Sequence, residues 1–250
     1  MAIATREITG AMILAAGKGT RLSTLTDSTP KVLLPVANFP ILEWILAWLR
    51  NYGISEIAIN LHHLSDRVQT FLGDGSRFGI KVHCSYEREL LGTALGAKKM
   101  AQYLGEDFVV CYGDVLTDLN LTDMIRYHFG HRAIATLALF PVSHRNDVGV
   151  VTLDKENKVT AFTEKAGKMA SQPVFANGGI YIMNKAVFNF VDRDGYMDFG
   201  NDVLPRLVMA ELPVYGFPID NDDYLLDIGT LERYRKANED TLAGKVKINL

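Results

Sequence analysis

The sequence has little of what marks secreted, membrane-spanning or nucleic-acid-binding proteins. It contains only two cysteines, no block of lysines and arginines, and no stretch of about 18 apolar residues that could cross a bilayer. Its formal net charge is −3, so a basic groove for nucleic acid is not expected. The first ten residues lack the apolar stretch of a signal peptide. These absences predict a soluble, cytoplasmic protein whose partners include no nucleic acid and no membrane.

The cysteines and histidines give no sign of a disulfide or a metal cluster. Cys84 and Cys111 each lie in an apolar run typical of a strand, and we expect both to be reduced core residues. His128 and His131 lie three apart on a predicted helix with no third ligand nearby. We therefore expect both histidines at the surface.

What the sequence does contain is an alternation of short apolar runs with amphipathic segments, which is typical of βαβ units and a parallel sheet. After about residue 132 the pattern changes to paired strands, including a hairpin over 148–163. We predict an α/β fold with a Rossmann-like, mixed but mostly parallel sheet flanked by helices, and a smaller antiparallel layer. The expected strands are 11–14, 57–60, 81–85, 108–111, 134–140, 148–153, 158–163, 175–183 and 224–228, and the expected helices are 41–49, 66–72, 93–103 and 231–242.

A glycine-rich segment, Leu14-Ala15-Ala16-Gly17-Lys18-Gly19-Thr20-Arg21, follows the first predicted strand. Small residues allow backbone N–H groups to approach a phosphate closely. The segment is neither a Walker A motif nor a G-x-G-x-x-G fingerprint, so a tight turn without a ligand is the alternative. Two cations favour phosphate binding: Arg21 ends the segment, and Lys31 follows Pro30, which stiffens the backbone.

Two aspartates follow or end apolar strands at separate points of the chain. Asp114 comes after strand 108–111, and Asp227 lies in strand 224–228. Ligands of open α/β sheets bind outside the carboxyl ends of the strands, and Mg²⁺ needs only one or two carboxylates besides phosphate oxygens and waters. We predict a Mg²⁺ site at Asp114 and Asp227. The alternative for Asp227 is support of a helix cap at Thr230.

Together these segments resemble the sugar-1-phosphate nucleotidyltransferases, also called NDP-sugar pyrophosphorylases. Residues 14–21 with Pro30-Lys31 resemble the family signature, and Leu91-Gly92-Thr93-Ala94 resembles its base- and ribose-binding turn. Gly113-Asp114 and Asp227 are similar to its two metal-binding aspartates. The likeness is strongest to the mannose-1-phosphate guanylyltransferase-like branch.

The resemblance extends over about residues 9–240 and implies the nucleotide-diphospho-sugar transferase fold. It implies one nucleotidyltransferase domain over 1–250, with a nucleotide half over about 9–132 and a sugar-binding half over about 133–250. No C-terminal left-handed β-helix is expected, and association into a homo-oligomer is left open. The residues implied for the nucleotide are Leu14, Ala15, Ala16, Gly17, Gly19, Thr20, Arg21, Glu87, Gly92, Thr93 and Gly113. The residues implied for the sugar phosphate are Gly149, Glu164, Lys165, Asn177 and Gly178.

The reaction implied by the resemblance is an in-line displacement at the α-phosphorus of a nucleoside triphosphate (NTP) by a sugar 1-phosphate, with loss of pyrophosphate. A phosphate monoester has a second pKa of about 6, so the nucleophile is already ionised at pH 7 and needs no general base. Arg21 would cover the leaving pyrophosphate, Lys31 would bridge the two reacting phosphates, and Asp114 would act through the metal. Catalysis would then consist of positioning and charge neutralisation.

Base choice depends on Glu87, which lies four residues before Leu91. A carboxylate accepts hydrogen bonds only, which favours guanine, because that base offers N1–H and N2–H₂ together. The best prediction is GTP with mannose 1-phosphate or a related hexose or heptose 1-phosphate. UTP with a sugar 1-phosphate, including N-acetylmuramate 1-phosphate, stays open. So does a solvated loop, because Glu87 stands in the charged run Glu87-Arg88-Glu89.

Two other classes of protein are alternatives. One is a catalytically silent regulatory subunit that binds an NDP-sugar, and such a protein would be expected to lack one of the charged site residues kept here. The other is a glycosyltransferase, whose metal is often held by a D-x-D pair. Asp192-Arg193-Asp194 and Asp220-Asn221-Asp222 have that spacing, but neither explains the glycine-rich segment.

Overall fold

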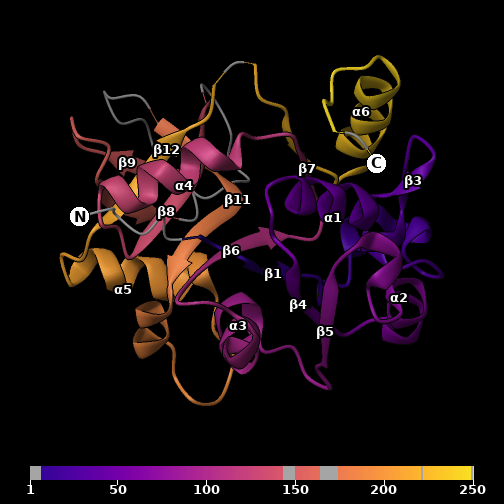
Figure 1. Ribbon diagram of the computed structural model, residues 1–250, viewed down its shortest axis with the longest axis horizontal. Helices are drawn as coiled ribbons and strands as arrows, with labels where there is room; N and C mark the ends of the chain where they lie inside the picture. Colours follow the sequence, from indigo (N-terminus) through magenta and orange to yellow (C-terminus); the bar gives the residue numbers. More distant parts are fainter. Residues whose placement is uncertain (1–6, 143–149, 164–173, 221, 249) are drawn as a thin grey trace.

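The structure, a computed structural model, describes residues 7–142, 150–163, 174–220, 222–248 and 250. In this part of the chain the predicted α/β fold is confirmed (Figure 1). A nine-stranded sheet has the order β10-β9-β11-β6-β1-β4-β5, with β8 paired to β11 and β12 paired to β8. Its strands are β1 (Gly10–Leu14), β4 (Glu56–Leu61), β5 (Lys81–Tyr86), β6 (Asp107–Tyr112), β8 (Ala135–Val142), β9 (Val150–Leu153), β10 (Val159–Thr163), β11 (Val174–Asn184) and β12 (Val214–Pro218).

The two halves of the sheet differ in strand direction. Strand β1 is parallel to β4 and β6, and β4 is parallel to β5. Strand β11 then runs antiparallel to β6, β8 and β9, and β10 runs antiparallel to β9, whereas β12 is parallel to β8. The second half therefore extends the parallel sheet from β6 outward with mostly antiparallel strands. Two small antiparallel pairs lie beside it, namely β2 (Pro35–Val36) with β3 (Phe39–Pro40) and β7 (Val115–Thr117) with β13 (Leu225–Asp227).

Helices cover both faces of the sheet because successive strand residues point to opposite sides. Ile13 packs in the core with α1, α2, α4 and α6, whereas Met12 packs in the core with α3 and α5. The α-helices are α1 (Ile41–Asn51), α2 (Ser65–Leu72), α3 (Gly92–Lys99), α4 (Leu121–Gly130), α5 (Leu204–Met209) and α6 (Leu231–Leu242). Shorter 3₁₀ turns span Thr20–Leu25, Lys31–Leu33, Ser76–Phe78, Ala101–Tyr103 and Lys185–Phe190, and a π turn spans Phe199–Val203. None of the described helices is both long and apolar enough to cross a membrane.

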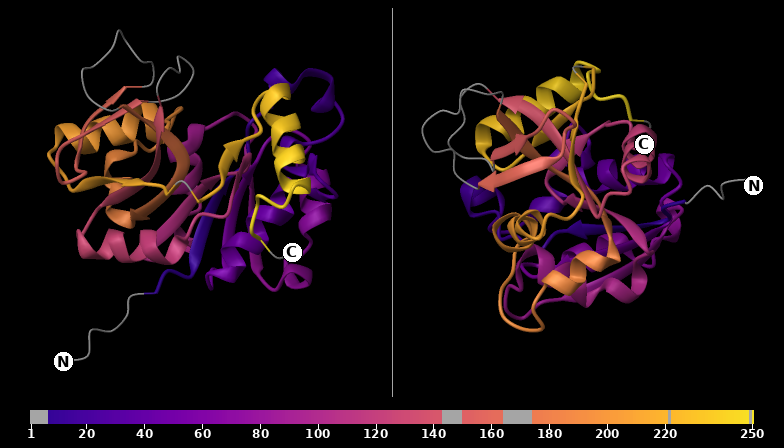
Figure 2. Two further views of the ribbon diagram at one scale, coloured as in Figure 1. Left: turned by 90° about the horizontal axis from the view of Figure 1, so that it is seen from above. Right: turned by 90° about the vertical axis from the view of Figure 1, so that its left-hand side faces the viewer.

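The carboxyl ends of β1, β4 and β6 meet at one edge of the sheet. Leu14 is paired with Asn60 on one side and with Tyr112 on the other. The segments that follow these residues therefore emerge side by side. Strand β13 reaches the same place because it pairs with β7, with Asp227 opposite Val115. Helix α6, yellow in Figure 2, then returns to pack beside β2, and Tyr234 Oη donates to the Pro35 carbonyl at 2.7 Å.

Several local expectations need correction. Cys84 is exposed, because its strand β5 is the outermost strand of the sheet, whereas Cys111 is buried as expected; both are free thiols. His128 is 1% exposed, because α4 packs on the sheet and its imidazole bonds Thr136 Oγ1 at 2.8 Å. The helix expected over 93–103 ends at Lys99, and a separate 3₁₀ turn follows. The sequence reading did not anticipate α5 and β12.

Candidate nucleotide site

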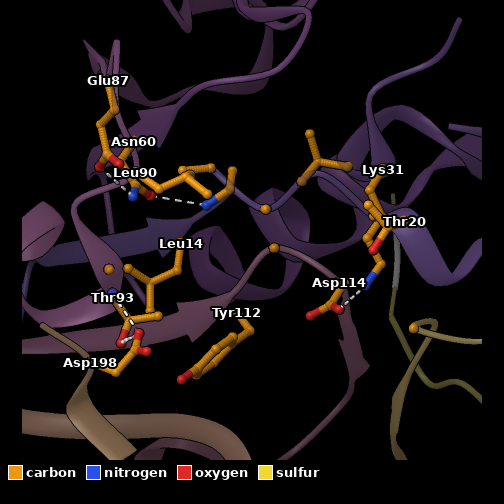
Figure 3. Close-up of a pocket in the computed structure, with 18 of the residues that line it drawn as sticks. Leu14, Thr20, Lys31, Asn60, Glu87, Leu90, Thr93, Tyr112, Asp114 and Asp198 are labelled. Carbon is orange, nitrogen blue, oxygen red and sulfur yellow. Dashed lines mark hydrogen bonds and ion pairs between the residues drawn. The ribbon is translucent and has the colours of Figure 1, made fainter. Parts of the chain in front are cut away.

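A pocket of about 320 Å³ opens at the edge where β1, β4 and β6 end (Figure 3). It gathers every residue predicted for the nucleotide, together with Lys31 and Asp114. Among the described residues it is lined by Leu14, Ala15, Ala16, Gly17, Gly19, Thr20, Arg21, Lys31, Val32, Asn60, Glu87, Leu90, Gly92, Thr93, Tyr112, Gly113, Asp114, Tyr196, Asp198 and Gly229.

The glycine-rich loop provides unpaired backbone donors. Within the described residues, the N–H groups of Gly17, Lys18 and Gly19 donate to no protein acceptor. A Cβ at Gly17 would meet no atom within 4 Å, so the protein itself does not require glycine there. Gly19 differs, because its φ is +67° and a Cβ would lie 2.9 Å from Thr26 Cγ2. Successive free N–H groups form a concavity that favours an anion.

Lys31 lies at the same end of the pocket. It begins a short 3₁₀ turn after Pro30, and its ammonium group forms an ion pair with Asp114 Oδ2. The two side chains are only 12% and 21% exposed. The next residue of the turn, Val32, packs so closely on Gly113 that a Cβ there would lie 2.8 Å from Val32 Cγ1. Gly113 therefore allows the lysine turn to approach the end of β6.

Asp227 lies next to Asp114 in the backbone, since the Ile228 N–H donates to the Asp114 carbonyl at 2.8 Å. The Asp227 carboxylate accepts from the Gly229 N–H at 2.9 Å and pairs with Arg233 Nη2 at 3.1 Å. Thr230 caps α6, so the turn-supporting alternative for Asp227 also holds.

These two aspartates fit a divalent cation that shares its ligands with phosphate. Both are carboxylates from adjacent backbone segments, although only Asp114 lines the pocket, and they form ion pairs with Lys31 and Arg233 respectively. Mg²⁺ takes such a partial donor set and completes it with phosphate oxygens and water. No group of three or more His, Cys, Asp or Glu side chains in the described part of the chain forms an all-protein metal site.

The opposite end of the pocket is closed by a buried polar network. Glu87 is 3% exposed, and its Oε1 accepts from Asn60 Nδ2 at 2.8 Å while Oε2 accepts from the Leu91 N–H at 3.0 Å. Asn60 Oδ1 in turn accepts from the Ala15 N–H at 3.0 Å. The alternative left open for Glu87, a solvated side chain in a charged loop, is therefore wrong. Asn60 was missed by sequence reasoning, although a polar residue near the end of a buried strand was a usable signal.

Residues 196–198 form one side of the pocket, which no local sequence pattern had predicted. Asp198 Oδ1 accepts from both the backbone N–H and the hydroxyl group of Thr93, each at 2.9 Å. The Met197 carbonyl accepts from the Ala94 N–H at 2.9 Å. Gly92 has φ +79°, and a Cβ would lie 2.3 Å from that same carbonyl oxygen. Glycine at 92 is thus required by the protein's own packing.

Tyr112 also lines the pocket, and its ring packs against the irregular part of β11 between Asn177 and Tyr181. A Cβ at Gly179 would lie 3.0 Å from Tyr112 Cδ2, and Asn177 Nδ2 donates to Tyr181 Oη at 2.6 Å. Burial, with Tyr181 adding to it, raises the pKa of the Tyr112 phenol, so it stays neutral. Asn177 and Gly178 do not line the pocket, and their assignment to the sugar stays a prediction.

The remaining predicted residues lie elsewhere. Gly149, Glu164 and Lys165 fall outside the described residues. Asp192 pairs with Arg206 on an exposed surface, and Asp220 and Asp222 line a separate acidic depression. Neither D-x-D spacing contributes to the pocket.

An anion-favouring loop beside Lys31 and Asp114, at the carboxyl edge of an α/β sheet, is typical of a nucleotide-binding protein. Residues 10–244 match the family described as Nucleotidyl transferase, and the chain belongs to that family. It is 34% identical to a UTP–glucose-1-phosphate uridylyltransferase of Synechocystis sp., over 95% of this chain and 64% of that protein. It is 32% identical to a D-glycero-alpha-D-manno-heptose 1-phosphate guanylyltransferase of Aneurinibacillus thermoaerophilus, over 92% of this chain and 97% of that protein.

A solved structure extends the comparison to three dimensions. HddC from Yersinia pseudotuberculosis, complexed with GMP-PN, aligns with a TM-score of 0.78 and 25% identity. The alignment covers 93% of this chain and 99% of that one.

Proposed function

We propose that this chain transfers a nucleotidyl group from an NTP to a sugar 1-phosphate and releases pyrophosphate, acting as one nucleotidyltransferase domain in the cytoplasm. The observation that carries the proposal is the phosphate end of the pocket. There, the unpaired N–H groups of Gly17 to Gly19 lie beside the Lys31–Asp114 ion pair. Family membership and relatives named for this reaction support the same assignment.

The chemistry needs charge neutralisation and alignment, and no proton has to be removed from the nucleophile. Lys31 is held within reach of the reacting phosphates because its turn is packed on Gly113. Arg21 lines the same end and would cover the pyrophosphate that leaves. Glu164 and Lys165 would hold the sugar and its phosphate.

Asp114 and Asp227 would hold Mg²⁺, which supplies positive charge to the phosphate oxygens when bound. Occupation of this site requires a change in the present ion pairs. Lys31 would exchange the Asp114 carboxylate for phosphate, while Arg233 continues to support Asp227 from α6.

GTP with mannose 1-phosphate or a related hexose or heptose 1-phosphate is the preferred substrate pair, and UTP is the alternative. Glu87 is an acceptor at the far end of the pocket and is held rigidly by Asn60 and Leu91. Guanine offers two neighbouring donors to such a carboxylate. The relative aligned over 97% of its own length is named as a guanylyltransferase, which favours the same choice.

The test is a matrix of four NTPs against several sugar 1-phosphates, with Mg²⁺ present and pyrophosphate release as the readout. We expect release only when an NTP and a sugar 1-phosphate are both present, and most with GTP. Lys31→Ala should remove the signal, while Lys81→Ala, a change of an exposed lysine on β5, should not. A protein that binds NDP-sugar but releases no pyrophosphate with any pair would be a regulatory subunit instead.

A further inference from the structure

Asp198 lies in the wall of the pocket with half of its carboxylate unused. It is 105 residues from Thr93 in the sequence, yet its Oδ1 accepts both hydrogen bonds that Thr93 donates, each at 2.9 Å. No residue in the described ranges donates to the second oxygen, Oδ2. A carboxylate oxygen accepts up to two hydrogen bonds, so Oδ2 retains its full capacity for a bound molecule.

The surroundings of Asp198 do not favour a phosphate group. The N–H groups of Thr93 and Ala94 in the first turn of α3, which would otherwise attract an anion, are taken by Asp198 Oδ1 and by the Met197 carbonyl. The negative charge of Asp198 would repel a phosphate in addition. This part of the wall therefore suits a neutral group that donates hydrogen bonds.

The position of Asp198 in the pocket indicates which hydrogen-bond donor of the substrates could reach it. In Figure 3 the Thr93–Asp198 pair lies apart from the Lys31–Asp114 pair, with Tyr112 between them. If the phosphates occupy the Lys31 end and the base occupies the Glu87 end, the parts of the substrates left for this region are their carbohydrate rings. Hydroxyl groups are the neutral donors that those rings carry.

We propose that Asp198 is a specificity residue whose Oδ2 accepts a hydrogen bond from a hydroxyl group of a carbohydrate ring in the pocket. That ring is either the ribose of the NTP or the ring of the sugar 1-phosphate. The proposal rests on the proposed function. Thr93 is the positioning residue, because its N–H and hydroxyl group fix the carboxylate through Oδ1.

The decisive variant is Asp198→Asn. It keeps an oxygen at the Oδ1 position for Thr93 and replaces Oδ2 by an amide NH₂ group, which donates rather than accepts. Asp194→Asn is the matched control, because it makes the same change at an exposed position of the same segment. Each protein is tested with ribonucleotides against 2′-deoxy and 3′-deoxy nucleotides, and with a hexose 1-phosphate against its 2-deoxy counterpart.

In either the nucleotide comparison or the sugar comparison, the wild type should prefer the ligand that carries the hydroxyl group. The preference should be roughly 10- to 100-fold in kcat/KM, the range expected for a hydrogen bond to a charged group. Asp198→Asn should abolish that preference by weakening only the hydroxylated ligand, and Asp194→Asn should keep it. A preference in the nucleotide comparison would show that the hydroxyl group belongs to the ribose. A preference in the sugar comparison would show that it belongs to the sugar 1-phosphate.

Equal loss with both members of every pair would mean that Asp198 only caps α3, and would overturn the proposal. So would a wild type that shows no preference in either comparison, a result that requires no variant to fold. Calorimetric binding of the same ligand pairs gives the ratios without turnover. A wild type that binds the hydroxylated ligand more tightly but releases no pyrophosphate would therefore contradict the proposed function and still support the role of Asp198.

Discussion

At one end of the pocket, the glycine-rich loop presents backbone donors that meet no acceptor within the described ranges, and Lys31 forms an ion pair with Asp114. At the other end, the polar groups are already joined to one another: Glu87 to Asn60 and Leu91, and Thr93 to Asp198. The first end depends on a ligand to complete its interactions, whereas the second is already held in place by its own hydrogen bonds and keeps Asp198 Oδ2 as an acceptor for a ligand.

This difference indicates how the site divides its tasks. A prearranged acceptor such as Glu87 rejects a wrong base, because an unmatched buried polar group is costly. The phosphate end holds charges that change partners when the triphosphate enters, which suits a reaction that moves charge. Mutations at the phosphate end should therefore lower turnover, whereas mutations at the other end should change substrate choice or stability.

The largest expected effect is at Lys31. Lys31→Ala should lower kcat by about 10²–10³-fold, because it removes a positioned charge from the reacting phosphates. The folded protein should survive, since the lysine is partly exposed and its removal opens one ion pair. Steady-state kinetics with a thermal melt test both statements. Near-normal turnover would remove Lys31 from the mechanism.

Gly92→Ala should act on stability. Its Cβ would lie 2.3 Å from the Met197 carbonyl oxygen at φ +79°, so we expect a loss of about 3 kcal/mol in the free energy of unfolding.

Gly53→Ala is the matched control for Gly92→Ala, because Gly53 has φ +80° with no atom within 4 Å of a Cβ. Its loss should be only about 1 kcal/mol. Urea denaturation compares the two. Equal losses would show that residues 196–198 shift to accommodate the added methyl group, and that this side of the pocket is not rigid.

Glu87→Gln should alter base choice. The amide NH₂ cannot accept from guanine, and one of the bonds to Asn60 and Leu91 is also lost. The ratio of kcat/KM for GTP over UTP should fall by roughly 10- to 100-fold. A parallel fall for both nucleotides would instead make Glu87 a structural residue of the turn.

The smallest effect on folding is expected at Gly17. Because a Cβ there meets nothing within 4 Å, Gly17→Ala should change the free energy of unfolding by less than about 0.5 kcal/mol. It should nevertheless weaken NTP binding, measured by calorimetry, because the methyl group would stand where phosphate approaches the backbone. Unchanged binding would place the triphosphate elsewhere.

The sequence alone supported the parts of the site that depend on local pattern. The glycine-rich loop, Lys31 and Asp114 follow strand ends that apolar runs reveal, and parallel strands bring such ends to one edge. The same logic would have found Asn60.

What sequence reading missed depends on contacts between distant segments. Asp198 reaches Thr93 only because residues 196–198 pack across α3. The conformation of Gly92 follows from that packing, and the burial of His128 follows from the way α4 lies on the sheet. Periodicity and spacing describe single elements, so they carry no information on such pairings.

In the proposed reaction, the sugar 1-phosphate attacks the α-phosphorus of the NTP. The direct test uses GTP labelled at either the α- or the γ-phosphate, with the sugar 1-phosphate that is most active in the matrix. We expect the α-label in the NDP-sugar and the γ-label in pyrophosphate, and we expect Lys31→Ala to reduce both transfers together. Transfer of the γ-label to the sugar phosphate, or release of either label as inorganic phosphate without a sugar 1-phosphate, would contradict it.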